Sequence, residues 1–283
     1  MKLYLNCNSK AEGSFTKDIY LLRAAKRLGI TNVLKYEPTK EPPEYVLNIE
    51  PYGPFMTGSI WTGIWEIDLL MSRPLERVNY ERANHIFCAI NHVPTQIKEH
   101  SEKTVLLYQA CDPEIHHPYK VEKKYDVVFY GSDEFEVYSE RKRIHQLITD
   151  KGYKIHLGGK HLPPEEYSKL SCEAKVMFIR SMGQTPDLGE IAQRFFEYYA
   201  MGPVLTNWTS DLTNVGVEGV DYCSYHNDIE MLIKLDRLLK EDDFRNYITK
   251  NGREIALNYH TYEHRLVTII NYIKEYESRN NRT

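Results

Sequence analysis

Short apolar runs alternate with amphipathic stretches along the whole chain. In the first half, runs rich in β-branched and aromatic residues predict strands, and apolar residues spaced three and four apart predict the helices between them. The predicted strands cover 2–6, 32–36, 45–49, 85–90 and 104–108, and the predicted helices cover 16–28 and 94–100. This alternation is typical of a parallel sheet with crossover helices on its faces.

The second half repeats the same alternation. The segment 125–130 reads YDVVFY, a continuous apolar run that suits a parallel strand buried on both faces. Further strands are predicted over 154–157, 175–179, 204–206 and 222–225, and helices over 165–172, 229–239, 242–257 and 261–277, with one more ending near 150. We therefore predict an α/β protein of two Rossmann-like domains, 1–118 and 119–283, that face each other across a cleft. Ligands of such sheets bind at the carboxyl ends of the strands.

The segment 187–206 combines an amphipathic helix with charged side chains. Asp187 is a predicted N-cap, and Glu190 three residues later completes a capping box. The polar side of this helix gathers Glu190, Gln193, Arg194 and Glu197. Two interpretations are open: a solvated ridge stitched by pairs such as Arg194–Glu197, or a ligand-binding edge. In the second, Arg194 would hold a phosphate and Glu197 the hydroxyls of a sugar.

The composition is that of an ordinary globular protein, with 42% hydrophobic and 27% charged residues among 283. The net charge of −4 lacks the basic excess that non-specific nucleic-acid binding uses. No apolar run approaches the length of about 18 residues that a membrane span needs. The first predicted strand starts at Lys2, which leaves no room for a signal peptide. The five cysteines lie far apart without a CxxC pair, so we expect reduced thiols in a cytoplasmic protein.

Two glycine-containing turns follow predicted strands of the second half. Gly131 and Ser132 come directly after 125–130, where backbone amides and a hydroxyl can hold a phosphate. Arg141, in the helix that follows, would add a planar positive charge. Lys160 belongs to a second loop, 158–161, where contact with a base or a phosphate is expected. The alternative for both loops is a plain turn, with a surface basic patch beside the first.

The first half offers candidates for acid–base chemistry and for acceptor binding. Glu66 or Asp68 could act as a base, and His92 could bond a sugar hydroxyl or act as a general acid or base. A loop that contains Gly13 and Ser14 follows the first predicted strand. Each of these residues also has a structural interpretation, as a turn former or a surface side chain.

The sequence contains no motif that implies a metal or a dinucleotide. Asp112, His116 and His117 share a turn-rich connector, but Asp112 is more often a turn former, and two adjacent histidines alone do not make a zinc site. The patterns HxH, HExxH and DxD are absent, as are GxxxxGK[ST] and GxGxxG after a strand. We therefore expect no metal and no cofactor, and disfavour a P-loop NTPase or a dinucleotide dehydrogenase.

Six short motifs occur in order between 112 and 273. They are Asp112-Pro113…Pro118, YDVVFYGS at 125–132, Arg141, RFFEYYAMG at 194–202, Gly252-Arg253, and Tyr259-His260-Thr261-Tyr262…Arg265. Together they resemble the GT-B glycosyltransferases, and within them the spore-maturation-type "glycosyl transferases group 1" domain. The first half is similar to these proteins only in outline.

The resemblance implies a nucleotide-sugar donor held mainly by the second domain. Glu197 matches the acidic residue of the family that binds the donor ribose. Arg194 and the Gly131-Ser132 turn would lie near the diphosphate, with Arg141 as a further candidate.

One position departs from the pattern. Related retaining transferases often carry another glutamate eight positions before the ribose-binding one. That position is Gly189 here, with Glu190 beside it, so the identity of the sugar and the stereochemical outcome are open.

The sequence therefore predicts a metal-independent glycosyltransferase that moves a sugar from a nucleoside-diphosphate sugar, with retention of configuration as the working expectation. Positive side chains and helix N-terminal amides would stabilise the diphosphate leaving group. The acceptor is expected on the first-domain side and can be a glycan, a protein, a small molecule or a modified DNA base. The resemblance also implies that the last helix crosses back to the first domain. The alternatives are a sugar-nucleotide epimerase or hydrolase on the same fold, and a non-catalytic nucleotide-sugar-binding module.

Overall fold

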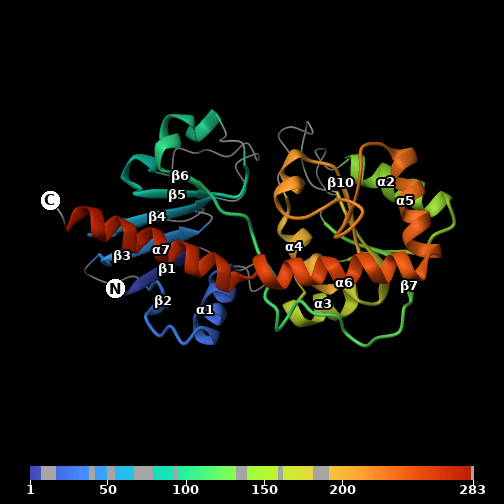
Figure 1. Ribbon diagram of the computed structural model, residues 1–283, viewed down its shortest axis with the longest axis horizontal. Coiled ribbons are helices and arrows are strands. Elements are labelled where there is room, and N and C mark those ends of the chain that lie inside the picture. Colours follow the sequence, from blue (N-terminus) through green and yellow to red (C-terminus); the bar gives the residue numbers. More distant parts are fainter. Residues whose placement is uncertain are drawn as a thin grey trace. The chain divides into compact units, whose positions relative to one another are not determined.

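The computed structural model describes residues 1–7, 17–37, 42–49, 55–66, 79–91, 95–131, 139–158, 162–180 and 191–281. The chain forms two compact α/β units (Figure 1). Unit 1 consists of Met1–Gln109 and Thr261–Thr283, and unit 2 is Ala110–His260. Each unit contains one parallel sheet with helices, as the hydrophobic pattern predicts, so the α/β fold with two Rossmann-like domains is confirmed.

The sheet of unit 1 has the strand order β2-β1-β3-β4-β5-β6, and all described pairs are parallel. Its strands are β1 (Leu3–Cys7), β2 (Val33–Lys35), β3 (Tyr45–Ile49), β4 (Trp61–Glu66), β5 (His85–Cys88) and β6 (Thr104–Leu106). The helices are α1 (Lys17–Arg27), the 3₁₀ segments Tyr80–Arg82 and Thr95–Lys103, and α7 (Tyr262–Asn280). The strand order reverses direction at β1, which has β2 on one side and β3 on the other.

The last helix, α7, packs within unit 1. The ring of Tyr262 stacks on Tyr20 of α1 with centroids 5.0 Å apart and meets Trp65 of β4 edge-on at 6.3 Å. The buried guanidinium of Arg265 donates from Nε to the Tyr108 carbonyl at 2.7 Å and from Nη2 to the Gln109 carbonyl at 2.9 Å. Arg265 therefore holds α7 against the segment that leaves unit 1 after β6.

The boundary between the two units lies between Gln109 and Ala110. The turn-rich connector in the sequence suggests a later boundary, near residue 118. The Cys111 amide donates to the His260 carbonyl at 2.9 Å, which joins the two ends of unit 2. His116 lies against Glu197, deep inside the same unit. The connector 112–118 therefore belongs to unit 2, and the residues after His260 belong to unit 1.

His85 at the start of β5 makes unit 1 sensitive to pH. The indole of Trp61 donates to His85 Nδ1 at 3.0 Å, and Tyr272 of α7 packs edge-on against the imidazole. Burial, and then the positive charge of Arg279, lower the pKa of His85, whereas Glu275 opposes them. The pKa of His85 is lower in the folded chain than in the unfolded chain. His85 therefore contributes its full share to the free energy of unfolding above about pH 6.5, and this contribution is lost as the pH falls below that value.

We expect the melting temperature of the wild type to fall between pH 7.5 and 5.5 by more than that of His85→Gln, which cannot titrate. Differential scanning calorimetry at both pH values measures this difference. An equal fall in the two proteins would contradict the assignment to His85.

The sheet of unit 2 has the strand order β11-β10-β9-β7-β8, again with all described pairs parallel. Its strands are β7 (Tyr125–Tyr130), β8 (Ile155–Gly158), β9 (Ala174–Ile179), β10 (Val204–Asn207) and β11 (Cys223–Tyr225). Its helices are α2 (Ser139–Asp150), α3 (Pro164–Ser171), α4 (Gln193–Met201), the 3₁₀ segment Ser210–Asn214, α5 (Asp228–Lys240) and α6 (Asp242–Tyr259). The order reverses between β7 and β9, and doubly wound sheets bind ligands at the carboxyl ends of the strands at such a point.

Helices cover both faces of this sheet. Apolar residues of α2 and α5 pack with β7, β9 and β10 in one buried cluster that includes Val127, Ile144, Phe178, Leu205 and Leu235. On the other side, α3 and α4 meet where the rings of Tyr167 and Tyr198 stack, with centroids 6.1 Å apart. The helix α6 covers α4, and the Arg253 guanidinium donates to the Ala200 carbonyl near the end of α4. As a result α4 is enclosed on several sides.

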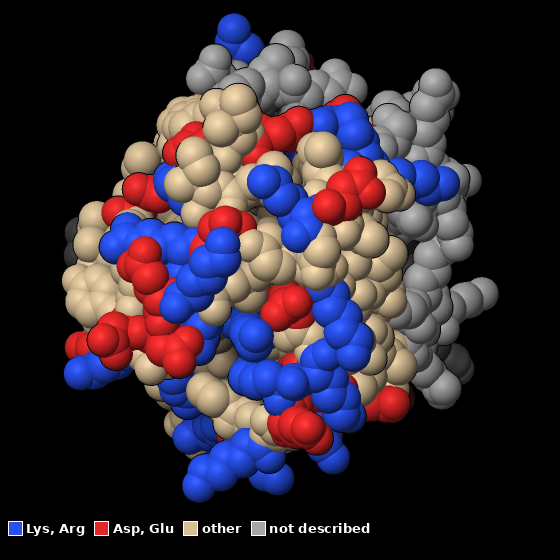
Figure 2. Space-filling view, turned by 90° about the vertical axis from the view of Figure 1, so that its right-hand side faces the viewer, with Lys and Arg blue, Asp and Glu red and all other residues tan. Residues whose placement is uncertain are grey.

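The outer surface of unit 2 carries charges of both signs. Figure 2 shows Lys and Arg side chains interspersed with Asp and Glu on one face of the molecule. Along α5 and at its C-cap, ion pairs join Lys240 to Asp236 at 2.7 Å and Arg237 to Glu241 at 3.0 Å. Exposed pairs of this kind contribute little to the stability of the fold, because solvent and salt screen them.

Candidate functional site

The carboxyl edge of the unit 2 sheet brings Gly131, Arg141 and Arg180 together. In the register that pairs Val128 with Met177, Gly131 comes level with Arg180. Arg141, in the first turn of α2, donates from Nη2 to the Arg180 carbonyl at 3.2 Å and lies over the Phe129 ring. A Cβ on residue 131 would lie 2.7 Å from the Phe129 ring and 3.2 Å from Arg141 Nη1, so the glycine leaves room for the guanidinium. Two predicted donor-binding residues thus lie side by side where β7 and β9 diverge.

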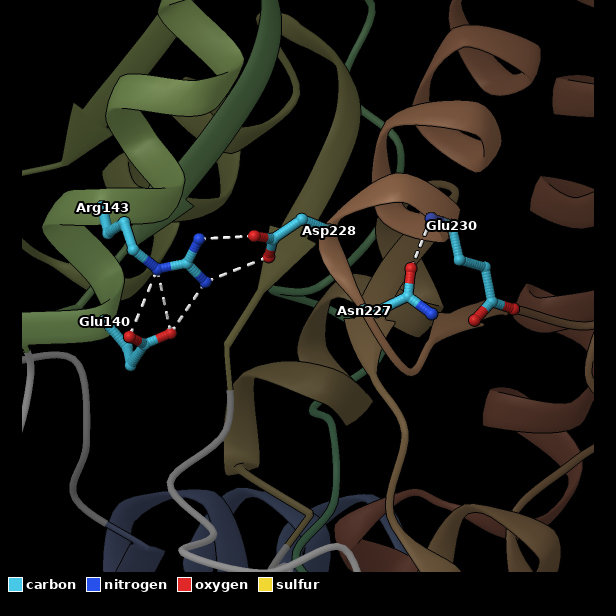
Figure 3. A network of polar contacts seen from close by, with 5 residues as sticks. All are labelled: Glu140, Arg143, Asn227, Asp228 and Glu230. Carbon is cyan, nitrogen blue, oxygen red and sulfur yellow. Dashed lines mark hydrogen bonds and ion pairs between the residues drawn. The ribbon is translucent and has the colours of Figure 1, made fainter.

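The neighbouring Arg143 has a different environment (Figure 3). Its guanidinium pairs with Asp228 at the start of α5 and with Glu140 one turn back, in the latter case at 2.9 Å. Arg143 therefore joins the starts of α2 and α5, and holds the pKa of Asp228 below its usual range. Of the basic run 141–143, Arg141 is the residue that reaches the sheet edge through a described contact.

The helix α4 begins at Gln193, and the predicted start at Asp187 is wrong. Ala192 is the N-cap, with φ −60° and ψ 148°, and its side chain makes no capping hydrogen bond. Asp187 and Glu190 lie outside the described residues, and they cannot form the capping box of a helix that starts at 193. The first amides of α4 are thus left without a cap from the side chain of Ala192.

The polar side of α4 is buried, so the interpretation as a solvated ridge is wrong for Gln193 and Glu197. Gln193 is 6% exposed and Glu197 is 0% exposed. Gln193 Nε2 donates to Glu197 Oε1 at 2.7 Å. The other carboxylate oxygen, Oε2, accepts no hydrogen bond of ordinary geometry from any part of the chain that the structure describes. The side chain of Tyr167 is hydrogen-bonded to the same carboxylate.

His116 reaches Glu197 from the turn after Ala110. The Asp112 amide donates to His116 Nδ1 at 2.9 Å, so the neutral imidazole carries its proton on Nε2. Nε2 lies 3.7 Å from Glu197 Oε1, and both side chains are fully buried. Asp112 shapes this turn by accepting a hydrogen bond from the Glu114 amide at 3.0 Å, as the structural interpretation of Asp112 predicts. In the sequence, the spacing between Asp112 and His116 within one turn is the pattern that indicates this contact between them.

Two tyrosines and Arg194 complete the surroundings of the carboxylate. Tyr167 of α3 is buried beside Glu197, and burial together with the carboxylate charge raises its pKa well above the ordinary value. Burial likewise raises the pKa of Tyr198, which the positive charge of Arg194 partly opposes. The side chain of Tyr167 is hydrogen-bonded to Glu197, and that of Tyr198 to Tyr167. Arg194, which is partly buried, thus lies near the two tyrosines that surround the buried Glu197.

The remaining predicted site residues fall elsewhere. Those outside the described residues are Gly13, Ser14, Asp68, His92, Ser132, Lys160 and Glu190. Glu66 ends β4 in unit 1, where only its backbone is described. At the same edge of unit 1, which sequence reasoning missed, Asn6 Nδ2 donates to Asn48 Oδ1 at 2.7 Å, and Asn48 Nδ2 to the Met56 carbonyl at 2.9 Å. This pair ties the ends of β1 and β3 to the loop before β4.

Several other motif residues make contacts that hold the fold together. Gly252 of α6 faces Tyr199 of α4, and the His260 ring lies 5.2 Å from the Phe196 ring. Arg253 and Arg265 bond backbone carbonyls, as described above. Among the described residues no group of three or more His, Cys, Asp or Glu is arranged to hold a metal ion. In the same part of the chain, no helix has the length and apolar character to cross a membrane.

A family model described as "Glycosyl transferase-like" matches residues 114–271, more than half of the chain. The matched segment contains His116, Gly131, Arg141, Arg194 and Glu197. No curated protein matches the sequence.

Solved structures with a similar fold include three transferases. HepE from Anabaena, in complex with UDP and glucose, has a TM-score of 0.63 and 11% identity, and the match covers 97% of this chain and 100% of that one. Sucrose-phosphate synthase from Thermosynechococcus elongatus has a TM-score of 0.61 and 10% identity, with coverage of 99% and 100%. A DNA-modifying β-glucosyltransferase, solved with and without UDP-glucose, has a TM-score of 0.61 and 12% identity, with coverage of 98% and 100%. At these identities the similarity shows the fold alone.

Proposed function

The chain belongs to the glycosyl transferase-like family and is a glycosyltransferase, and we propose that unit 2 binds its donor, a nucleoside-diphosphate sugar, with Glu197 on the ribose. The observation that carries this proposal is the fully buried Glu197 carboxylate, which lies among Gln193, His116 and Tyr167. A carboxylate only accepts hydrogen bonds, and the hydroxyls of a ribose are neutral donors that match it. The solved structures with UDP or UDP-glucose support a nucleotide donor on this fold.

The diphosphate would lie at the carboxyl edge of the sheet. There the guanidinium of Arg141 lies over Gly131, and Arg guanidinium groups bind phosphate with two parallel hydrogen bonds. Arg194 and the amides at the start of α4 are the second positive element, because a helix N-terminus favours anions. In this proposal these groups stabilise the leaving diphosphate without a metal ion. Retention of configuration, for which Glu190 is the candidate residue, stays a prediction.

Glu197→Gln tests the proposal directly. The variant keeps the shape and one acceptor oxygen but loses the charge, so we expect nucleoside-diphosphate affinity to fall about tenfold. Isothermal titration calorimetry with UDP, GDP and ADP, alone and as their glucose or mannose conjugates, measures this loss. Because the ligand-free protein then no longer buries a charged side chain at this position, we expect its melting temperature to stay level or rise.

Glu140→Gln is the matched control, since Glu140 is a carboxylate that pairs with Arg143 at the surface. We expect its nucleotide affinity to equal that of the wild type. Two results would oppose the proposal: a wild-type protein that binds none of these nucleotides, or an unchanged affinity in Glu197→Gln.

A further inference from the structure

The chain passes between the two units at two points, and unit 2 joins these points to each other. The first lies between Gln109 and Ala110, and the second between His260 and Thr261. The amide and the thiol of Cys111 both donate to the His260 carbonyl, at 2.9 and 3.3 Å. The start and the end of unit 2 are therefore one buried structure.

Two consecutive residues of α4 contact this structure. The ring of Phe196 lies beside the ring of His260, with centroids 5.2 Å apart. The carboxylate of Glu197 faces His116, which belongs to the turn after Ala110. All four side chains are buried. The helix that carries the proposed donor-binding carboxylate thus contacts the chain near both points at which it leaves unit 2.

The turn fixes the orientation of the His116 ring. The His116 amide donates to the Asp112 carbonyl at 2.7 Å, and the Asp112 amide donates back to His116 Nδ1 at 2.9 Å. The second bond places the proton of the neutral imidazole on Nε2, which lies 3.7 Å from Glu197 Oε1. This distance exceeds that of an ordinary hydrogen bond, and contacts of this kind often tighten when a ligand binds.

The groups around the Glu197 carboxylate come from different parts of unit 2. Gln193 donates from the same helix at 2.7 Å, and Tyr167 is hydrogen-bonded to the carboxylate from α3. His116 belongs to neither helix and reaches the carboxylate from the turn after the unit boundary. A ligand that moves or fixes the carboxylate therefore acts on this turn through the imidazole.

We propose that His116 is a positioning residue of the donor site: its Nε2–H orients Glu197 and couples the occupancy of the site to the order of the turn 111–118. This inference rests on the proposed donor site, and it concerns how the carboxylate is held and not which group of the donor it binds. Coupling between a site and a distant segment is reciprocal, so a nucleotide that tightens the contact between His116 and Glu197 also stabilises the turn.

Amide hydrogen exchange of the wild type tests the coupling without any substitution. The protein is compared alone and with a saturating nucleoside diphosphate, UDP, GDP or ADP. We expect the amides of 111–118 to exchange about fivefold more slowly with the nucleotide, beyond the change in α5 (Asp228–Lys240). The helix α5 is the reference because it gains only the overall stabilisation that a ligand gives to unit 2. Equal slowing of the two segments would overturn the inference.

Asparagine and glutamine at position 116 separate the roles of the two ring nitrogens. In His116→Asn the side-chain oxygen takes the place of Nδ1 and keeps the bond from the Asp112 amide, but the side chain is too short for Glu197. In His116→Gln the side-chain nitrogen takes the place of Nε2 and can donate to Glu197. We expect His116→Asn to bind the nucleotide about tenfold more weakly and to lose the additional protection of 111–118. His116→Gln should keep most of both, as measured by calorimetric titration and hydrogen exchange.

A purely structural role of His116 in the turn predicts the opposite order, with His116→Asn closer to the wild type than His116→Gln. That order, or equal losses in the two variants, would contradict the inference. His117→Asn is the control in the same turn, because the His117 ring stacks on Tyr119 with centroids 4.2 Å apart, and its nucleotide affinity should equal that of the wild type. A wild type that binds none of the nucleotides refutes the donor site itself, which Glu197→Gln tests separately.

Discussion

Replacing Gly252 with valine is expected to lower the free energy of unfolding of unit 2 by about 3 kcal/mol, at the upper end of the range for overpacking. A Cβ at this position would lie 2.6 Å from the Asp221 carbonyl oxygen and 2.8 Å from the Tyr199 ring. The carbonyl belongs to the backbone and cannot turn away. The Tyr199 hydroxyl donates to the Val215 carbonyl at 3.3 Å, so its ring is also held. The helix α6 would have to move away from α4, which carries Glu197.

Urea denaturation followed by circular dichroism measures this loss, with amide hydrogen exchange in 110–260 as the local readout. Lys250→Val on the same helix is the control, because Lys250 is exposed and the change tests only the lower helix propensity of valine. That control should cost about 0.5 kcal/mol. Equal effects of the two substitutions would mean that Gly252 is not required for the contact between α6 and α4.

The strands were predictable because their apolar runs are continuous and end at turn residues. The predicted strands 45–49 and 125–130 agree with β3 (Tyr45–Ile49) and β7 (Tyr125–Tyr130), both of which lie within parallel sheets. The strand β4 (Trp61–Glu66) was not predicted, because Gly63 interrupts its run of aromatic and β-branched residues. Its pairing with β3 and β5 supplies what the local sequence lacks.

The site was predictable only in part, and α4 shows why. Its periodicity correctly groups Gln193 and Glu197 on one side, but polar residues on one side of a helix normally indicate solvent. Here that side meets His116, which is 81 positions away from Glu197 in the chain, and Tyr167 on another helix. No local pattern encodes such contacts, so the burial of the carboxylate was invisible in the sequence. The family motif pointed to Glu197 and Arg194, whereas the position of Tyr167 beside Glu197 depends on tertiary packing alone.

Replacing Arg141 with methionine is expected to weaken nucleoside-diphosphate binding about 100-fold while the affinity for the free nucleoside stays the same. Methionine keeps the apolar packing on Phe129 but removes the guanidinium that lies over Gly131. A paired guanidinium–phosphate contact is among the strong hydrogen bonds, with about 1.5 to 3 kcal/mol for each bond to a charged group. Calorimetric titration with UDP, UMP and uridine, and with the guanosine series, separates the phosphate contribution from that of the nucleoside.

Arg143→Met gives this experiment its control on the same helix. This substitution removes the same charge two residues away. The guanidinium of Arg143 is already paired with Glu140 and Asp228, so we expect nucleotide affinity to stay the same. Because Arg141 also donates to the Arg180 carbonyl, a purely structural role would lower the affinity for uridine and for UDP by the same factor. Suppose that Arg141→Met lowers the affinity for the phosphorylated ligands only, and that Arg143→Met lowers none. This result would place the diphosphate where β7 and β9 diverge. Equal losses in the two variants would instead reflect the net charge of this face of unit 2 and would remove Arg141 from the donor site.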